Sequence, residues 1–267
     1  MGLFGKLFEK KTCSVCEGEI GLLGNRKLED GNLCKECAKK LSPWFDERRH
    51  STVEQIKAQL EYREANKEKV AAFNVTRSFG ECTRVLLDED AGVFMVTDET
   101  SSKKLAEENP DVLAFSDVTG CDLDIDEDRT ELKRTNSQGE EISYNPPRYS
   151  YDYNFYVKIH VRNPYFDEMR VKLNRSSVSI EHQQGGNRGM LLGGVQSFSP
   201  ERDMEYRQYK QMGEELKNAL MQARQQQRNA AAEAAAPKAA VNCPWCGATT
   251  TPDANGCCEY CGGAVNG

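Results

Sequence analysis

The chain has 267 residues, 38% of them hydrophobic, with a formal net charge of −7 and a mean hydropathy of −0.70. This length suits one ordinary domain and two small modules, and the lack of any run of about 18 apolar residues argues against a transmembrane helix. Residues 81–140 carry 6 basic and 17 acidic side chains. Since no segment has the strongly basic face that grips phosphates, the charge pattern disfavours nucleic-acid binding.

Residues 1–11 form a short amphipathic segment. The apolar side chains of Leu3, Phe4, Leu7 and Phe8 share one face of a short helix, and lysines lie elsewhere. The segment could lie in a membrane interface or dock on the protein's own surface, and we favour docking. It lacks a long apolar signal region, so we expect a cytoplasmic protein. In that compartment paired cysteines indicate metal ligands rather than disulfides.

The first zinc module is predicted over residues 12–50. Cys13 and Cys16 form one Cys-x-x-Cys pair, and Cys34 and Cys37 form a second. Two such pairs complete the closed tetrahedral four-thiolate site of structural zinc. A knuckle, a hairpin and a helix that starts at Cys34 predict a treble-clef-like finger. Rubredoxin-like iron also fits four thiolates, but nothing in the sequence suggests a redox partner.

A helix is predicted over residues 51–78, with a capping box at Ser51 and Glu54. Residues 79–229 then form a β domain. Many short alternating strands joined by turns, such as Asn136–Gly139, indicate an antiparallel barrel or sandwich. A second long helix begins after Ser199, with Pro200 at its first position. The fold class is therefore α+β.

Three patterns in the β domain have competing interpretations. Asp122, Asp124, Asp126 and Asp128 alternate but fail the EF-hand spacing, so we predict a strand with its aspartates in water. The glycine-rich residues 185–194 lack the Gly-Lys-Ser/Thr ending of a phosphate loop, so we predict a flexible connection. The tyrosines of residues 144–156 could stack on bases, but we favour a protein-binding surface or core lining.

The chain ends in an alanine-rich linker, residues 230–241, and a second zinc module, residues 242–267. Its predicted ligands are the sulfurs of Cys243, Cys246, Cys258 and Cys261. A segment this short needs a metal or disulfides to fold, so metal binding and folding are coupled there. We therefore predict two structural Zn²⁺ ions in the whole chain.

The remaining cysteines, Cys82, Cys121 and Cys257, stand outside the four pairs. None has a neighbouring motif that would activate a nucleophile, and His160 and His182 have no Ser or Cys motif nearby. We therefore expect no catalytic residues and no enzyme activity.

Residues 12–50, from Cys13-Ser-Val-Cys16 to Leu33-Cys-Lys-Glu-Cys37, resemble a bacterial family of unknown function, common in Firmicutes and named for its N-terminal four-cysteine module. The resemblance implies the same four cysteine ligands and a cytoplasmic bacterial protein, and it implies no activity. The β region, with Val112–Val118 and a terminal helix, looks like a bacterial PH or GRAM-type domain. The tail is similar to generic zinc ribbons.

The function predicted from the sequence is a non-catalytic zinc-binding adaptor or scaffold that mediates protein–protein interaction, with a partner of unknown identity. The first alternative is a nucleic-acid-binding regulatory protein that uses the zinc modules, supported by the net positive charge of residues 1–80. The second is a peripheral membrane-associated protein with weak contact through residues 1–11.

Overall fold

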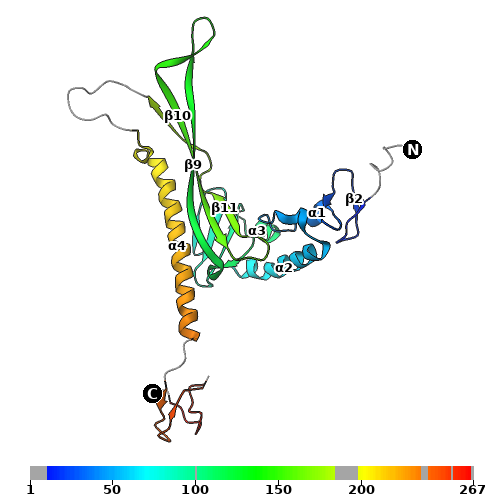
Figure 1. The fold of residues 1–267 in the computed structure, drawn as a ribbon, viewed down its shortest axis with the longest axis vertical. Helices are drawn as coiled ribbons and strands as arrows, with labels where there is room; N and C mark the ends of the chain where they lie inside the picture. The colour runs from blue at the N-terminus through cyan, green and yellow to red at the C-terminus, as the bar shows by residue number, and fades with distance from the viewer. Residues whose placement is uncertain (1–10, 100, 184–197, 236–239, 254, 266–267) are drawn as a thin grey trace, which may run out of the picture. The chain divides into compact units, whose positions relative to one another are not determined.

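The computed structural model describes residues 11–99, 101–183, 198–235, 240–253 and 255–265. The chain divides into two compact units, Met1–Gln225 and Gln226–Gly267, and each is considered by itself. Helices are combined with antiparallel sheets (Figure 1), as the α+β class predicts. None of the helices in the described part of the chain has the length and apolar character of a membrane span.

The described residues of the first unit form two small two-stranded sheets and two four-stranded antiparallel sheets. The small sheets are formed by β1 (Lys11–Thr12) with β2 (Glu19–Ile20), and by β3 (Arg26–Lys27) with β4 (Asn32–Leu33). The first large sheet has the order β5 (Arg77–Phe79), β6 (Arg84–Asp88), β7 (Val93–Thr97) and β8 (Leu113–Ala114).

The second large sheet is built around one long strand. It contains β9 (Val118–Thr135), β10 (Glu141–Val161), β11 (Glu168–Lys172) and β12 (Val178–Gln183). Strand β9 pairs along one edge of β10, so β11 and β12 follow one another along the other edge. Since β12 pairs with β10 only as far as Arg148, residues 133–147 continue as a two-stranded ribbon (Figure 1).

The helices of the first unit are α1 (Lys35–Ala38), α2 (Val53–Ala72), α3 (Ser102–Glu108) and α4 (Met204–Ala235), the last of which runs on into the second unit. Three 3-10 turns in the described part of the chain lie between these helices: η2 (Glu47–His50), η3 (Phe115–Asp117) and η4 (Pro200–Arg202). The second unit adds the two-stranded sheet of β13 (Val241–Asn242) and β14 (Thr249–Thr250).

The main core lies between the two large sheets and α4. Along β10 the side chains alternate, so that Tyr153, Phe155, Val157 and Ile159 are buried and the residues between them are not. This two-residue period follows from the pleat of a strand. In α4 the buried residues recur at helical spacing, and Gly213 lets the helix approach β9 closely, since a β-carbon there would lie 2.4 Å from Leu123 Cδ1.

The β5–β8 sheet is covered on both faces. Val85 and Leu87 point into the main core, and Leu86, between them, joins a second cluster with Val70 of α2 and Met95. Burial on both faces explains why β6 and β7 are almost continuously apolar.

Several sequence-based expectations need correction. The large sheets do not close into a barrel, because each is a separate four-stranded sheet. The capping box of α2 is formed by Thr52 and Gln55 rather than Ser51 and Glu54, because the hydroxyl of Ser51 instead donates to the carbonyl of Glu47. After Ser199 the chain forms the 3-10 turn η4, and Asp203 accepts a hydrogen bond from the Tyr206 N–H at the start of α4.

Other elements match or extend the predictions. The sequence predicts a hairpin over Arg84–Val96, and β6 and β7 form it. The predicted Asn136–Gly139 turn is also present. The sequence predicts strands over Val118–Ile125 and Thr130–Arg134, and both belong to one continuous strand, β9. Helix α3 was not predicted. The amphipathic residues 1–10 and the glycine-rich residues 185–194 lie outside the described residues.

Candidate metal centres

The first cysteine pair lies in a tight turn between β1 and β2. The Cys13 N–H donates to the carbonyl of Gly18, and the Glu17 N–H donates back to the carbonyl of Cys13. These bonds hold the Cys13 and Cys16 sulfurs on the same side of the turn. Glu17 has a positive φ of 61°, a conformation in which a residue with a β-carbon is strained.

The second pair stands at the start of α1. Cys34 is the N-cap of this helix, and its sulfur accepts the Cys37 N–H at 3.3 Å. The Cys34 N–H in turn donates to the Cys13 sulfur at 3.3 Å. The partial positive charge at a helix N-terminus stabilises thiolates in this position. The knuckle, hairpin and helix therefore follow in the order that the sequence predicts.

The four sulfurs of this module converge at distances that suit a metal ion. All four lie within 4.8 Å of one another, and those of Cys16 and Cys34 are 3.7 Å apart. A tetrahedral zinc ion with Zn–S bonds of about 2.3 Å requires sulfurs about 3.8 Å apart. A disulfide requires about 2.05 Å, and all eleven cysteines are free thiols.

The pKa values of the N-terminal cysteines indicate that four thiolates require a bound cation. Desolvation opposes ionisation of Cys13, but N–H donors from Cys16, Cys34 and Val15 outweigh it and lower the pKa of Cys13 to about 6. Desolvation and three neighbouring sulfurs raise the pKa of Cys37. One thiolate forms readily and a further one is disfavoured, so four thiolates can coexist only around a positive ion.

The C-terminal module repeats the arrangement with two knuckles. In each, the first cysteine's N–H donates to the carbonyl five residues on, and a glycine with positive φ, Gly247 or Gly262, closes the turn. The Cys243 and Cys261 sulfurs are 3.5 Å apart, and those of Cys246 and Cys258 are 3.7 Å apart. Desolvation of Cys258 is again outweighed by backbone N–H donors, which lower its pKa to about 6.

Both four-cysteine groups are therefore positioned to bind metal ions, consistent with the two structural zinc ions predicted from the sequence. The group at the C-terminus includes Cys258 and not the adjacent Cys257, whose N–H bonds to the side chain of Asp253. Cys121 is buried in the main core, and desolvation raises its pKa to about 12. Cys82 is exposed.

The acidic alternation of β9 is a charged sheet surface. Asp124 accepts from Lys158 at 2.9 Å, and Arg170 bridges Asp124 and Asp126. His160 lies 3.5 Å from Asp122. Pairing across the strands explains the pattern without calcium.

The tyrosines predicted as one cluster fall into two groups. Tyr153 is buried in the core with Phe155. Arginines cover the other group: Arg148 lies over the Tyr144 ring and Arg129 over the Tyr149 ring. The structure thus divides the cluster between core lining and cation–π pairs on the ribbon.

A buried polar network, which sequence reasoning missed, joins the first module to the β5–β8 sheet. Arg63 of α2 pairs with Asp111 at 2.8 Å, and their side chains are 5% and 0% exposed. Ser42 donates to the same carboxylate at 2.7 Å, and Arg63 donates to the carbonyl of Lys40. No motif marks these residues, because the contacts join positions 23 to 69 residues apart.

A model of a domain of unknown function (DUF4428) matches residues 12–59. The match fits the resemblance of the N-terminal module to a family of unknown function, and it extends into α2. That extension agrees with the packing, since Ile56 of α2 belongs to the same small core as Cys13, Leu28 and Leu33. No curated protein and no solved structure matches the chain.

Proposed function

We propose that the chain is a cytoplasmic, non-catalytic adaptor whose two zinc modules present apolar docking surfaces to protein partners. One observation carries this proposal. Among the described residues, four of the six exposed large hydrophobic side chains lie on the four-cysteine modules. Apolar side chains that a small module leaves in water mark interaction sites when they lie together.

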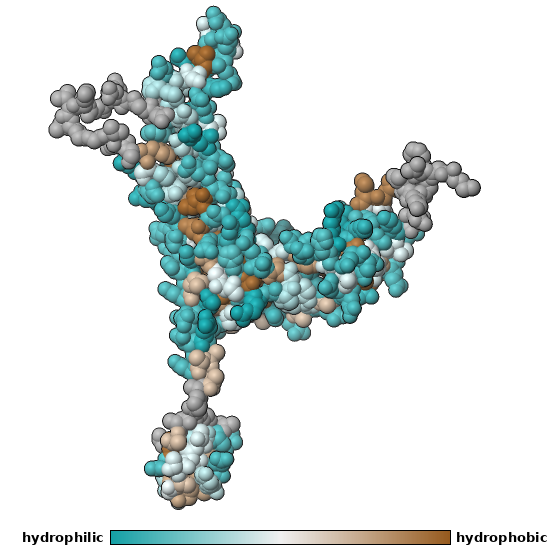
Figure 2. Space-filling model, in the orientation of Figure 1, coloured by the Kyte–Doolittle hydropathy of each residue, from teal (hydrophilic) through white to brown (hydrophobic). Residues whose placement is uncertain are grey.

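The N-terminal surface is the turn Gly21–Gly24. Leu22 is 83% exposed and its neighbour Leu23 is 90% exposed. The Gly24 N–H closes the turn on the carbonyl of Gly21 at 2.9 Å, and Figure 2 shows an apolar patch on this module. Two adjacent leucines held at a turn tip can enter a partner's pocket together.

The C-terminal surface carries two aromatic rings. Trp245 and Tyr260 each hold the third position of a Cys-x-x-Cys turn, and they are 75% and 70% exposed. The Trp245 indole N–H donates to the carbonyl of Ala264 at 3.0 Å, which fixes the ring while its face stays open. Rigid exposed aromatic rings are typical anchors of protein interfaces.

The metal has a structural role in this proposal. Four thiolates fill a tetrahedral site and leave no open position for a substrate or water, unlike catalytic zinc. When bound, zinc would fix the turns that carry the leucines and the aromatic rings. The ligands proposed are the four cysteines of each module.

The resemblance of residues 79–229 to a PH or GRAM-type domain stays a prediction. The packing of α4 on the sheets supports it, and the separate four-stranded sheets oppose it. Nucleic-acid binding has little support, because arginines already cover the Tyr144 and Tyr149 rings.

Peripheral membrane association is a second candidate, favoured by the basic residues near the leucine turn. Arg26 donates to the carbonyl of Leu23, and repulsion from Arg26 and Arg49 adds to desolvation in lowering the pKa of Arg48. Apolar side chains beside basic residues suit an anionic lipid surface. Here the leucines would enter lipid instead of a protein pocket.

Affinity capture with the zinc-loaded chain from its native host tests the adaptor proposal. The variants are Leu22→Ser/Leu23→Ser and Trp245→Ser/Tyr260→Ser, and the control is Val75→Ser, which changes an exposed apolar residue outside both modules. We expect a defined protein to be lost with one double variant and retained with the control. Identical capture by all variants contradicts the proposal, and leucine-dependent sedimentation with anionic liposomes favours the membrane candidate.

A further inference from the structure

A cavity of about 430 Å³ opens between the C-terminal half of α2, strands β7 and β8, and the loop that follows β10. Its size falls in the range of small-molecule sites. It lies apart from both four-cysteine groups, since none of their residues lines it. Neither the adaptor proposal nor the metal sites account for it.

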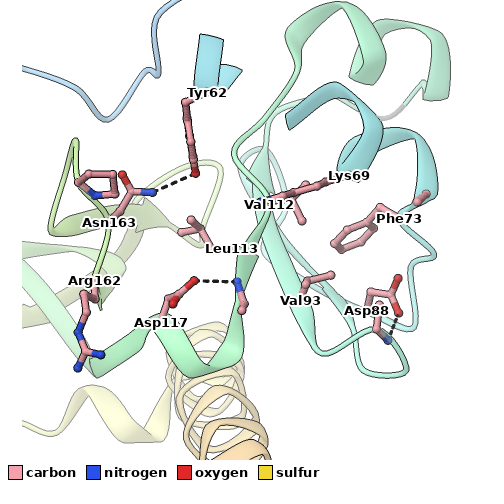
Figure 3. A pocket seen from close by; sticks show the side chains of 14 residues that line it. Tyr62, Lys69, Phe73, Asp88, Val93, Val112, Leu113, Asp117, Arg162 and Asn163 are labelled. Carbon is pink, nitrogen blue, oxygen red and sulfur yellow. Dashed lines mark hydrogen bonds between the residues drawn. The ribbon is translucent and has the colours of Figure 1, made fainter. Parts of the chain in front are cut away.

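The walls of the cavity are mostly apolar. Phe73 and Val93 contribute from one side, and the buried Leu113 of strand β8 and the preceding Val112 also line the cavity (Figure 3). An apolar body of a ligand would be removed from water there, which favours binding by about 25 cal/mol for each Å² buried.

The acidic groups of the cavity are already engaged. Asp88 accepts the N–H groups of Asn74 and Ala91 at 2.8 and 3.0 Å, and Asp117 accepts the Ala114 N–H at 3.3 Å. Their negative charge is therefore partly neutralised by backbone donors, and these contacts fix the carboxylates in the walls (Figure 3).

The donors of the cavity are free to bind a ligand. Within the described part of the chain, the side chains of Lys69 and Arg162 form no ion pair, and the Lys69 ammonium lies 6.0 Å from the centroid of the Tyr62 ring. The Tyr62 hydroxyl accepts from the Asn163 amide at 3.1 Å and so keeps its own proton to donate. Desolvation raises the pKa of Tyr62, which keeps this donor neutral at physiological pH.

An extended peptide strand fits the cavity poorly. Two backbone N–H groups along residues 112–114, at and just before β8, are occupied by the chain's own side chains: Val112 donates to Asn66 Oδ1 at 3.0 Å, and Ala114 donates to Asp117. A peptide that added a strand at this edge would find those donors taken.

We propose that this cavity binds a small amphiphilic anion. The hydrocarbon or aromatic body of the ligand lies against Phe73, Val112 and Leu113. Its carboxylate is held at the rim by Lys69 and the hydroxyl of Tyr62, and Arg162 adds positive charge to the cavity lining. The inference is independent of the adaptor function, because no residue of either docking surface takes part.

The test is a fluorescence titration of the zinc-loaded full chain with 1-anilinonaphthalene-8-sulfonate, an aromatic ring system with one negative charge. Ala72, the last residue of α2, is exposed at the cavity wall, and Ala71 is equally exposed but does not line it. Ala72→Phe places a ring in the mouth, and Ala71→Phe is the matched control. Lys69→Glu/Arg162→Glu reverses the rim charge. Dodecanoate and uncharged dodecanol serve as competitors.

We expect one saturable site that weakens at least tenfold with Ala72→Phe and stays unchanged with Ala71→Phe. Charge reversal should weaken binding by about tenfold, since two exposed charge pairs are lost. Dodecanoate should displace the dye better than dodecanol. Thermal unfolding followed by circular dichroism verifies that each variant is folded. Binding that is absent, or unaffected by Ala72→Phe in a folded protein, overturns the site, and equal competition by dodecanol overturns the preference for an anion.

Discussion

The buried ion pair between Arg63 and Asp111 connects the N-terminal module to the β5–β8 sheet, and we predict that its loss lowers the free energy of unfolding. Asp111→Asn keeps the shape of the side chain and removes its charge. The Arg63 guanidinium would then stay buried without a counterion, although the amide oxygen could still accept one hydrogen bond. Breaking a buried pair costs about 3–5 kcal/mol, and we expect a loss near the lower end, about 3 kcal/mol.

Two further variants provide reference values for the loss in free energy of unfolding. Ser42→Ala removes one hydrogen bond to a charged group and the acceptor of the Trp44 N–H, and it leaves the ion pair intact, so it should cost about 2 kcal/mol. Glu64→Gln removes a partner of the surface pair with Lys67, whose side chains are both more than half exposed. Exposed pairs contribute about 0.2–1 kcal/mol, so this control should cost less than 1 kcal/mol.

The assay is urea unfolding of the zinc-loaded chain, followed by far-ultraviolet circular dichroism, with zinc content measured for each variant. A loss of about 3 kcal/mol is large against the 5–15 kcal/mol of a typical domain. If Asp111→Asn and Glu64→Gln cost the same, the Arg63 charge is solvated in the folded protein, and the interpretation of this network is wrong.

Three further outcomes follow from the metal modules and the leftover cysteines. Glu17→Gly should stabilise the N-terminal module by up to about 1 kcal/mol in thermal unfolding, because glycine tolerates a positive φ. Glu36→Gly, in α1, is the control and should destabilise the module. A loss of stability in Glu17→Gly would contradict the prediction. Alkylation at pH 8 should modify Cys82 and spare Cys121, because pH 8 lies below the Cys121 pKa of about 12 and this buried thiol stays protonated. Mass spectrometry measures modification at both sites. Early modification of Cys121 would show that its thiol is not buried. Chelation should abolish the dispersed NMR signals of residues 242–265 and keep those of the β domain, whereas retained C-terminal signals would show that the module folds without metal.

The metal groups could be predicted from the sequence because their signal is local. A Cys-x-x-Cys turn fixes two sulfurs within four residues, and the helix after Cys34 follows from nearby residues. The β6–β7 hairpin could also be predicted from the sequence, since Val85 to Val96 contain both strands and their turn. In each case the interacting residues are close together in the sequence, so a local pattern predicts the structure.

Features that depend on distant contacts could not be predicted. The continuity of β9 through Asp126 depends on its pairing with β10 and on the ion pair with Arg170, and no local pattern in the sequence shows these contacts. The N-cap of α2 lies one residue after the predicted position because the Ser51 hydroxyl donates to the carbonyl of Glu47 in η2. The cavity depends on Tyr62 and Arg162, which are a hundred residues apart in the sequence, and no local pattern places them together.

The central claim, two closed four-thiolate zinc sites, is tested most directly by the metal content of the chain purified under reducing conditions. We expect two zinc ions per chain by elemental analysis, one in Cys13→Ser, one in Cys243→Ser, and two in the control Cys257→Ser. One zinc or none in the unmodified chain, iron in place of zinc, or loss of metal in Cys257→Ser without loss in Cys258→Ser would contradict the account.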